Sequence, residues 1–303
     1  MSTIINGIGR VGIRNFTSTT PTPSYLLDTY GGASVGYSLR KLSSTYTGNA
    51  IRVRRSSDNA EQDFGFIADV LDTASLLTFV GAGNGFVTTW YDQSGVGRNA
   101  IQTTASLQPQ IVVSGVVNIL NNKPSILWSD TYDKFMANTL AISTNSITIA
   151  AVYSSKNYSN FTKLISIGSD QSNSGLAYIP FAGSSQYDWI TNDFVFFGSG
   201  YNLLPPRIAS NGQVHPDNVQ TYGFLNANNT NTNMYLNGNE ISYRVQQTGN
   251  INLGNGFIRL GNSDIWAQQQ FRGNMQEIIV YPINQNANLT NINTNINSYY
   301  SIY

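Results

Sequence analysis

The chain has 303 residues, which suffices for one large all-β domain or two small ones. Charged residues make up only 11%, and 16 basic residues balance 16 acidic ones, so the composition gives no electrostatic reason to expect binding to nucleic acid or to an anionic membrane. Cysteine is absent, which excludes disulfides, thiolate catalysis and cysteine-ligated zinc.

Residues 1–17 predict a short extended arm, and the Thr- and Pro-rich residues 18–24 predict a linker. The first ten residues carry no basic stretch followed by an apolar one, so no secretory signal is expected. An arm without a core of its own becomes ordered by docking on a neighbouring subunit. This arm resembles the N-terminal segments of structural proteins in bacteriophages that infect Bacteroidota. Its expected docking residues are Ile5, Gly7, Arg10, Val11 and Arg14.

A glycine motif within the arm matches the dinucleotide-binding fingerprint G-x-G-x-x-G at Gly7, Gly9 and Gly12. That fingerprint binds a pyrophosphate only where a helix begins directly after it. Here several threonines follow, together with Pro21 and Pro23, and these residues disfavour a helix. No cofactor is therefore expected at this motif.

From residue 25 onward, short apolar or alternating runs are separated by Gly, Asn and Ser, which predicts many short strands. In one run, Ile147, Ile149 and Ala151 share a face, as in a half-buried strand. The pair Asn237-Gly238 predicts a tight hairpin. The predicted strands are Asn49–Arg55, Phe86–Tyr91, Pro124–Trp128, Ser146–Tyr153, Lys163–Ile167, Tyr187–Phe197, Thr221–Asn226, Asn233–Leu236, Gly256–Leu260 and Met275–Tyr281.

Helices are expected to be few and peripheral. The spacing of Val35, Leu39 and Leu42 predicts a short helix within Gly32–Ser44, and Asp72 is a suitable N-cap for a helix over Thr73–Val80. Many strands without βα alternation predict an all-β, two-sheet antiparallel sandwich over residues 25–303. A C-terminal closing helix is predicted by an apolar stripe formed by Leu289, Ile292, Ile296, Tyr299 and Tyr303.

Two groups of residues carry a resemblance to known families. Trp90–Ala100 contains the run Tyr-Asp-Gln-Ser-Gly, and together with Tyr37–Gly48 and Val53–Asp58 it resembles the catalytic β-sandwich of family 54 α-L-arabinofuranosidases. Met234–Gly238 and Phe271–Tyr281 resemble the closing strands of the wider concanavalin A-like and laminin-G-like class. These resemblances imply a concanavalin A-like jelly roll with a few short peripheral helices.

The resemblance also implies where a catalytic pair would lie. A retaining glycosidase uses two carboxyl groups about 5–5.5 Å apart, one as nucleophile and one as acid/base. Alignment with the family places Val195 at the nucleophile position and Asn262 at the acid/base position. Neither side chain performs these steps, so no enzymatic activity is expected. Asp193 and Asp264 are the alternative carboxylates if the alignment is displaced by a residue or two.

Other residues suited to catalysis are scarce. The only glutamates are Glu61, Glu240 and Glu277; we expect Glu240 in a solvated hairpin and Glu277 facing solvent or a loop. The only histidine, His215, lies in a predicted loop, and a single histidine without cysteines disfavours a zinc site. No metal cofactor is expected, with Ca²⁺ at Asp92 as the one alternative.

The residues around Asp92 have two interpretations. In the first, Asp92 and nearby carbonyl groups bind a ligand or Ca²⁺. In the second, which we favour, Asp92 and Asn99 hydrogen-bond to the loop backbone, while Gly95 and Gly97 supply positive φ angles. The turn interpretation therefore assigns these four residues to the fold.

Glycan contact is expected at an exposed aromatic ring surrounded by amide groups, which is how sugar-binding sandwiches stack a sugar. Trp266 lies in a Gly-, Asn- and Gln-rich loop and fits this description. The candidate carbohydrate-binding residues are Trp266, Gln268, Gln270, Asp264, Asp92 and Asn99.

The sequence thus predicts a non-enzymatic structural or appendage protein on a virion surface, such as a capsid decoration, a head fibre or a tail fibre. We expect the arm to bind other virion proteins, the lectin-like sandwich to contact host-surface glycans, and the chain to form a homo-oligomer. An arabinofuranosidase-type hydrolase with relocated carboxylates and a bacterial surface adhesin are the alternatives. No apolar run reaches the roughly 18–20 residues of a membrane span, so membrane insertion is not expected.

Overall fold

The computed structural model describes residues 25–128, 135–141, 145–156, 163–169, 174–182, 193–198, 207–211, 219–249, 255–261 and 271–303. The predicted arm and linker lie outside these residues, and so do the expected docking residues Ile5, Gly7, Arg10, Val11 and Arg14. Their roles stay predictions.

The first sheet is built around strand β24 (Gly273–Tyr281). β24 pairs with β14 (Ser146–Ser155) along one edge, and with β1 (Val35–Ser38) and β12 (Ile126–Trp128) along the other. All these pairings are antiparallel. The further strands joined to this sheet are β2 (Ile51–Arg55), β3 (Glu61–Phe64), β6 (Gly85–Trp90), β7 (Ala100–Ile101), β8 (Gln110–Val113), β9 (Val116–Val117), β19 (Thr221–Asn228), β20 (Thr232–Leu236) and β21 (Asn239–Glu240).

The second sheet follows the order β13–β23–β15–β16–β17–β18–β22, again with antiparallel neighbours. β7 connects the two sheets because it pairs with both β6 and β13. The strands of this sheet are β13 (Phe135–Ala141), β15 (Ile165–Ser169), β16 (Ser174–Ala182), β17 (Asp193–Gly198), β18 (Arg207–Ser210), β22 (Tyr243–Gln247) and β23 (Asn255–Leu260).

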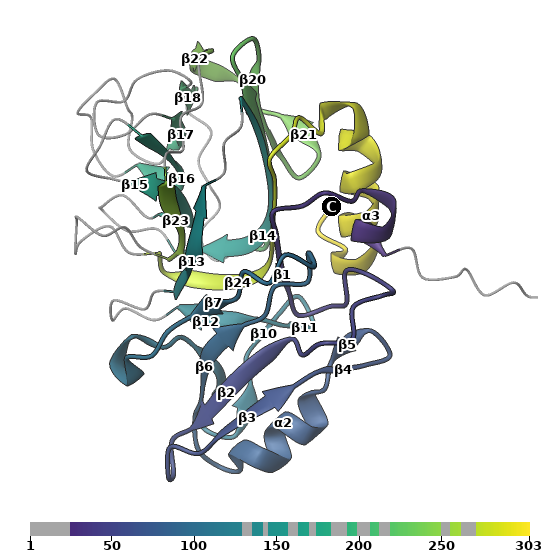
Figure 1. The fold of residues 1–303 in the computed structure, drawn as a ribbon, viewed down its shortest axis with the longest axis vertical. Coiled ribbons are helices and arrows are strands. Elements are labelled where there is room, and N and C mark those ends of the chain that lie inside the picture. The colour runs from purple at the N-terminus through teal and green to yellow at the C-terminus, as the bar shows by residue number, and fades with distance from the viewer. Residues whose placement is uncertain are drawn as a thin grey trace, which may run out of the picture.

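Short peripheral elements complete the described chain, and Figure 1 shows α3 and α1 together on one side of the first sheet while α2 lies beside β3. These elements are the hairpins β4 (Phe66–Ile67) with β5 (Val70–Leu71) and β10 (Ile119–Leu120) with β11 (Lys123–Pro124), the helices α1 (Leu26–Thr29), α2 (Thr73–Val80) and α3 (Leu289–Tyr300), and the 3-10 turns Ala105–Leu107 and Asn286–Asn288.

The core lies between the two sheets, where buried side chains of β14 and β24 pack with those of β15 and β23. Ile147, Ile149 and Ala151 point to this side, which confirms the predicted alternation. Ala150 and Val152 point to the opposite side and pack in a second buried cluster with α1 and α3. β14 is therefore buried on both faces, which explains why its run is apolar at almost every position.

The predicted closing helix is confirmed as α3, and its buried residues include Ile292, Ile296 and Tyr300. The helix ends at Tyr300, because the next residue, Ser301, takes the left-handed φ of 51°. Tyr303 was predicted on the apolar stripe, but it lies beyond the helix and is 52% exposed. The other predicted helix, Thr73–Val80, is confirmed with its N-cap, since Asp72 accepts a hydrogen bond from the Ser75 N–H at 3.0 Å.

The helix predicted within Gly32–Ser44 is wrong, because the structure places strand β1 there. Val35, Leu39 and Leu42 are buried as expected, but β1 is enclosed on both faces and pairs with β24 from Val35 to Ser38. Pairing with a central strand overrides the helical spacing of three apolar residues.

Each predicted strand overlaps an observed one, and the all-β sandwich is confirmed. The run Tyr187–Phe197 overlaps only from Asp193, where β17 begins, because 183–192 lie outside the described residues. The hairpin at Asn237-Gly238 is confirmed by φ angles of 48° and 79°, as a tight two-residue turn requires. Within the described chain, no helix is both long and apolar enough to span a membrane.

Candidate functional site

Asp92 organises the turn that follows β6. Its Oδ1 accepts hydrogen bonds from the backbone N–H groups of Gly36 (2.8 Å) and Ser94 (2.9 Å). Its Oδ2 accepts hydrogen bonds from the Ser94 hydroxyl (2.8 Å) and the Arg98 N–H (2.9 Å), while Asn99 Oδ1 accepts from the Asp92 N–H (3.0 Å). A carboxylate offers about four lone-pair positions, and four donors occupy them. These bonds agree with the turn interpretation, and Ca²⁺ binding at Asp92 stays an alternative prediction.

Gln93 holds the same turn against the segment that contains β1. It is only 2% exposed, and its Nε2 donates to the carbonyl oxygens of Ser38 and Arg40, both at 3.0 Å. Its Oε1 accepts from the Leu42 N–H at 2.8 Å, and its own N–H donates to the Gly36 carbonyl at 2.8 Å. The turn is therefore a fixed wall, because the side-chain amide and the backbone N–H of Gln93 are all used within the fold.

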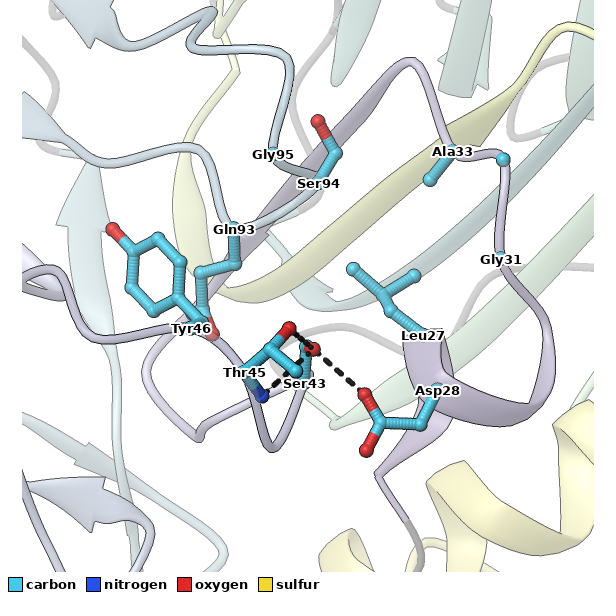
Figure 2. Close-up of a pocket in the computed structure, with 11 residues that line it drawn as sticks. Leu27, Asp28, Gly31, Ala33, Ser43, Thr45, Tyr46, Gln93, Ser94 and Gly95 are labelled. Carbon is cyan, nitrogen blue, oxygen red and sulfur yellow. Dashed lines mark hydrogen bonds between the residues drawn. The ribbon is translucent and has the colours of Figure 1, made fainter.

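A pocket of about 320 Å³ opens beside this turn (Figure 2). Four segments that are separate in the sequence line it: the α1 residues Leu27 and Asp28, residues 31–33, residues 43–46, and residues 93–95. Gly32 and Gly95 have φ angles of 81° and 85°, which side chains rarely adopt, and a Cβ at either glycine would meet no atom within 4 Å. Both glycines thus let the backbone turn while leaving space open around it.

Asp28 is the one charged side chain that lines the pocket. Its Oδ1 accepts from the Ser43 hydroxyl at 2.7 Å and from the Ser44 N–H at 3.1 Å, and its Oδ2 lies 3.1 Å from the same N–H. The bond from Ser43, followed by those from Ser44, lowers the pKa of the Asp28 carboxyl below its ordinary value, so this group is ionised at neutral pH. The Ser43 hydroxyl also lies 3.0 Å from that of Thr45, which is exposed.

The Tyr46 ring contributes an apolar wall (Figure 2). Its hydroxyl donates to the Asn49 carbonyl at 2.8 Å, and its ring packs edge-on against Phe66, with 6.4 Å between centroids. Burial raises the pKa of Tyr46 to about 12, so the ring stays neutral at physiological pH. The pocket therefore combines one anion, small hydroxyl groups and a fixed aromatic ring.

The prediction that Glu277 faces solvent or a loop is wrong, because the structure buries this residue. It is 0% exposed, and Arg40 binds both its oxygens, with Nε at 2.7 Å from Oε2 and Nη2 at 2.9 Å from Oε1. The hydroxyls of Ser38 (2.8 Å) and Tyr300 (3.2 Å) also donate to Oε2. Burial alone would lower the pKa of the Arg40 guanidinium, but the Glu277 carboxylate offsets this and raises it.

The sequence held a signal for this burial that the prediction missed. In the run Met275–Tyr281, residues on both faces of the strand are apolar, and Glu277 shares a face with Ile279 and Tyr281. A strand that is apolar on both faces is enclosed on both, so a lone glutamate within it needs a buried partner. The pairing of β1 with β24 places Ser38 opposite Glu277 and brings Arg40, two residues further on, within reach of it, and the sequence does not display this register.

The other two glutamates lie on the surface. Glu61 binds Arg52 at 2.8 Å, and both side chains are more than one-third exposed. Glu240 lies in the solvated hairpin as predicted, where it accepts hydrogen bonds from Asn233 (2.6 Å) and Tyr243 (2.8 Å). Among the residues that the structure describes, no group of three or more His, Cys, Asp and Glu side chains is arranged to hold a metal ion.

Most of the predicted glycan-binding residues lie outside the described residues, namely Trp266, Gln268, Gln270 and Asp264, and their roles stay predictions. Asn262 and His215 also lie outside them. Val195 is within β17, where its backbone pairs with Ile179 on β16 and Ala209 on β18. Asp92 and Asn99 are brought together in the turn beside the pocket, and direct glycan contact by either stays a prediction.

Searches among protein-family models and among curated proteins find no match. Solved structures do match. One is an arabinofuranosidase complexed with arabinofuranosyl-α-1,2-xylobiose, with a TM-score of 0.63 and 15% sequence identity. Another is a variant of a family 54 α-L-arabinofuranosidase soaked with 4-nitrophenyl α-L-arabinofuranoside, with a TM-score of 0.63 and 14% sequence identity. The folds are alike. A family 54 α-L-arabinofuranosidase soaked with a cyclic sulfate inhibitor has a TM-score of 0.61 and 16% sequence identity.

In each of these comparisons, the match covers 90% of this chain and 65% of the solved chain. The chain therefore spans about 65% of the length of these three arabinofuranosidase structures. At this identity the likeness shows the fold, and the predicted resemblance to the family 54 sandwich is confirmed at that level.

Proposed function

We propose that this chain is a non-enzymatic structural or appendage protein of a virion, whose sandwich contacts host-surface glycans. The observation that carries the non-enzymatic part is the state of the three glutamates. Glu277 is enclosed beneath Arg40, while Glu61 and Glu240 are engaged by polar neighbours on the surface. None of them lines the pocket, so no glutamate there supplies the carboxyl pair of a retaining glycosidase.

The glycan part of the proposal rests on the fold and on the pocket. Solved structures with the same fold are complexed or soaked with arabinofuranosyl compounds, and this chain has a polar pocket with an aromatic wall. The virion part rests on the sequence, because an arm without a core suits docking on a neighbouring subunit. In this proposal the arm binds other virion proteins, and the protein is a homo-oligomer on the virion surface.

The test of the virion part is mass spectrometry of purified virus particles from a culture in which this chain is expressed. Detection of the chain in intact particles supports the proposal, and its absence from them contradicts it. Deletion of residues 1–17 serves as the matched variant. We expect loss from particles with an unchanged far-ultraviolet circular dichroism spectrum, since the sandwich begins at residue 25.

The fold likeness also favours a second candidate, an arabinofuranosidase that uses relocated carboxylates. Asp193 at the start of β17 and Asp264 are the residues this candidate requires. The assay is release of 4-nitrophenol from 4-nitrophenyl α-L-arabinofuranoside. Release that is abolished by both Asp193→Asn and Asp264→Asn would establish the enzyme and refute the non-enzymatic proposal. We expect no release above that of buffer.

A further inference from the structure

The pocket beside the Asp92 turn has the dimensions of a site for one small molecule. Its volume of about 320 Å³ lies at the lower end of the range for ligand sites, roughly 300–1,000 Å³. The wall formed by the Asp92 turn is rigid, because the buried Gln93 side chain hydrogen-bonds to the backbone of Ser38, Arg40 and Leu42. A preformed site loses little conformational entropy when a ligand binds.

The groups around the pocket suit a ligand rich in hydroxyl groups. The contacts of the Asp28 carboxylate occupy three of its four lone-pair positions, which leaves one on Oδ2 for a donor from a ligand. The Ser43 hydroxyl already donates to Asp28, so Thr45 Oγ1, which lies 3.0 Å from it, is the hydroxyl with acceptor positions left for a ligand. Gly32 and Gly95 also line the pocket, and the space where a Cβ would lie is open at both.

The charge of the pocket argues against an acidic ligand. Asp28 is ionised, and no basic side chain lines the pocket to offset it. Lys41, a cation that acts on Asp28, lies outside the lining and places its Nζ 5.8 Å from the ring centre of Tyr25. A carboxylate on the ligand would therefore be repelled, since like charges at short range disfavour binding.

Apolar groups complete the complementarity. Leu27 and the ring of Tyr46 both line the pocket (Figure 2), and the ring is fixed at its hydroxyl and at its edge. A sugar ring presents C–H groups on its faces and hydroxyls around its rim, so it matches a site with an apolar wall and a polar rim.

We propose that this pocket binds one neutral saccharide unit, with the free lone pair of Asp28 accepting a hydrogen bond from a sugar hydroxyl and with Tyr46 packing against the sugar ring. The proposal rests on the proposed glycan contact and gives it a location in the described part of the chain. It also gives the ligand a class, a neutral rather than an acidic sugar.

The test uses the full-length protein on an array that carries glycans ending in neutral pentoses or hexoses together with glycans ending in sialic acid or uronic acids. Thr45→Trp places a large ring at the exposed mouth of the pocket, and Thr78→Trp is its control at an exposed position of α2. Asp28→Asn removes the charge, and Asp58→Asn is its control at an exposed carboxylate paired with Arg55. Thermal melts verify that all four variants fold.

We expect neutral glycans to bind, and we expect Thr45→Trp and Asp28→Asn each to weaken binding about 10-fold or more while both controls bind as the unchanged protein does. Glycan binding that is insensitive to both pocket variants would overturn the pocket and leave the proposed glycan contact intact. Binding of acidic glycans alone would overturn the ligand class. Absence of binding to every glycan would overturn the pocket together with the glycan part of the proposed function.

Discussion

Replacement of Arg40 by methionine tests how much the buried ion pair between Arg40 and Glu277 stabilises the fold. Arg40→Met keeps an unbranched side chain of similar length and removes the charge. Glu277 would then remain 0% exposed with only the hydroxyls of Ser38 and Tyr300 as donors. Arg40 also donates to Asn295 at 3.0 Å and lies 5.1 Å from the ring centre of Tyr299, so the variant loses contacts with α3 as well.

The magnitude follows from the burial of both partners, whose side chains are 8% and 0% exposed. Removal of one member of a buried pair typically costs about 3–5 kcal/mol of unfolding free energy, because the remaining charge is left without its partner. Replacement of both members by apolar residues costs much less, since no charge stays buried. The double variant Arg40→Met with Glu277→Leu is therefore expected to recover most of the loss.

The assay is equilibrium unfolding in urea, followed by tryptophan fluorescence because Trp90 and Trp128 are buried. Arg55→Met is the control, since Arg55 forms a surface pair with Asp58, and its effect is expected to be far smaller. A loss below about 1 kcal/mol in Arg40→Met would refute the reasoning. So would a double variant whose loss equals the sum of the two single losses.

Three further predictions concern the turn, the tyrosines and a glycine. Asp92→Asn replaces an acceptor by a donor that faces N–H groups, so the melting temperature should fall well below that of Asn99→Asp; equal melting temperatures would contradict this. Burial raises the pKa of Tyr46 and, together with Asp63, that of Tyr91, each to about 12. Because the folded-state pKa values of both tyrosines are raised, the stability that the neutral rings contribute is full below about pH 10 and is lost as the pH rises toward 12. The free energy of unfolding in urea should therefore be lower at pH 11 than at pH 9, and equal values would contradict this. In Gly273→Ala the added Cβ overlaps the Ser154 carbonyl, so soluble expression should drop sharply, and expression at the wild-type level would show that the strands adjust.

The strands were predictable because the local pattern carries their signal. β14 has alternating residues that face one core, and the hairpin at Asn237-Gly238 has the residues that positive φ angles demand. The helix predicted over Gly32–Ser44 was wrong for a reason the local pattern cannot convey. Three apolar residues at helical spacing also fit a strand that is buried on both faces, and only the partner strand β24 decides between them.

The pocket was beyond prediction from the sequence because four distant segments form it. No sequence pattern distinguishes Asp28 from other acidic residues, and only the fold places it beside Ser43 and the turn at Gln93. The turn itself was predictable, since Asp92, Asn99 and two glycines are typical of a loop that is hydrogen-bonded to its own backbone. The sequence therefore identified one wall of the candidate site, and tertiary structure supplied the rest.

The position of β24 has a consequence for biosynthesis. β1 pairs with it from Val35 opposite Val280 to Ser38 opposite Glu277, and β12 and β14 also form ladders with it. During synthesis, β1 therefore cannot form this pairing until β24, some 240 residues later, has been made. Each of these three strands keeps an open edge from its own synthesis until β24 is made, and open edges recruit other chains. Yield in a foreign host should therefore depend on chaperone capacity and on the speed of translation more than on the final stability of the sandwich.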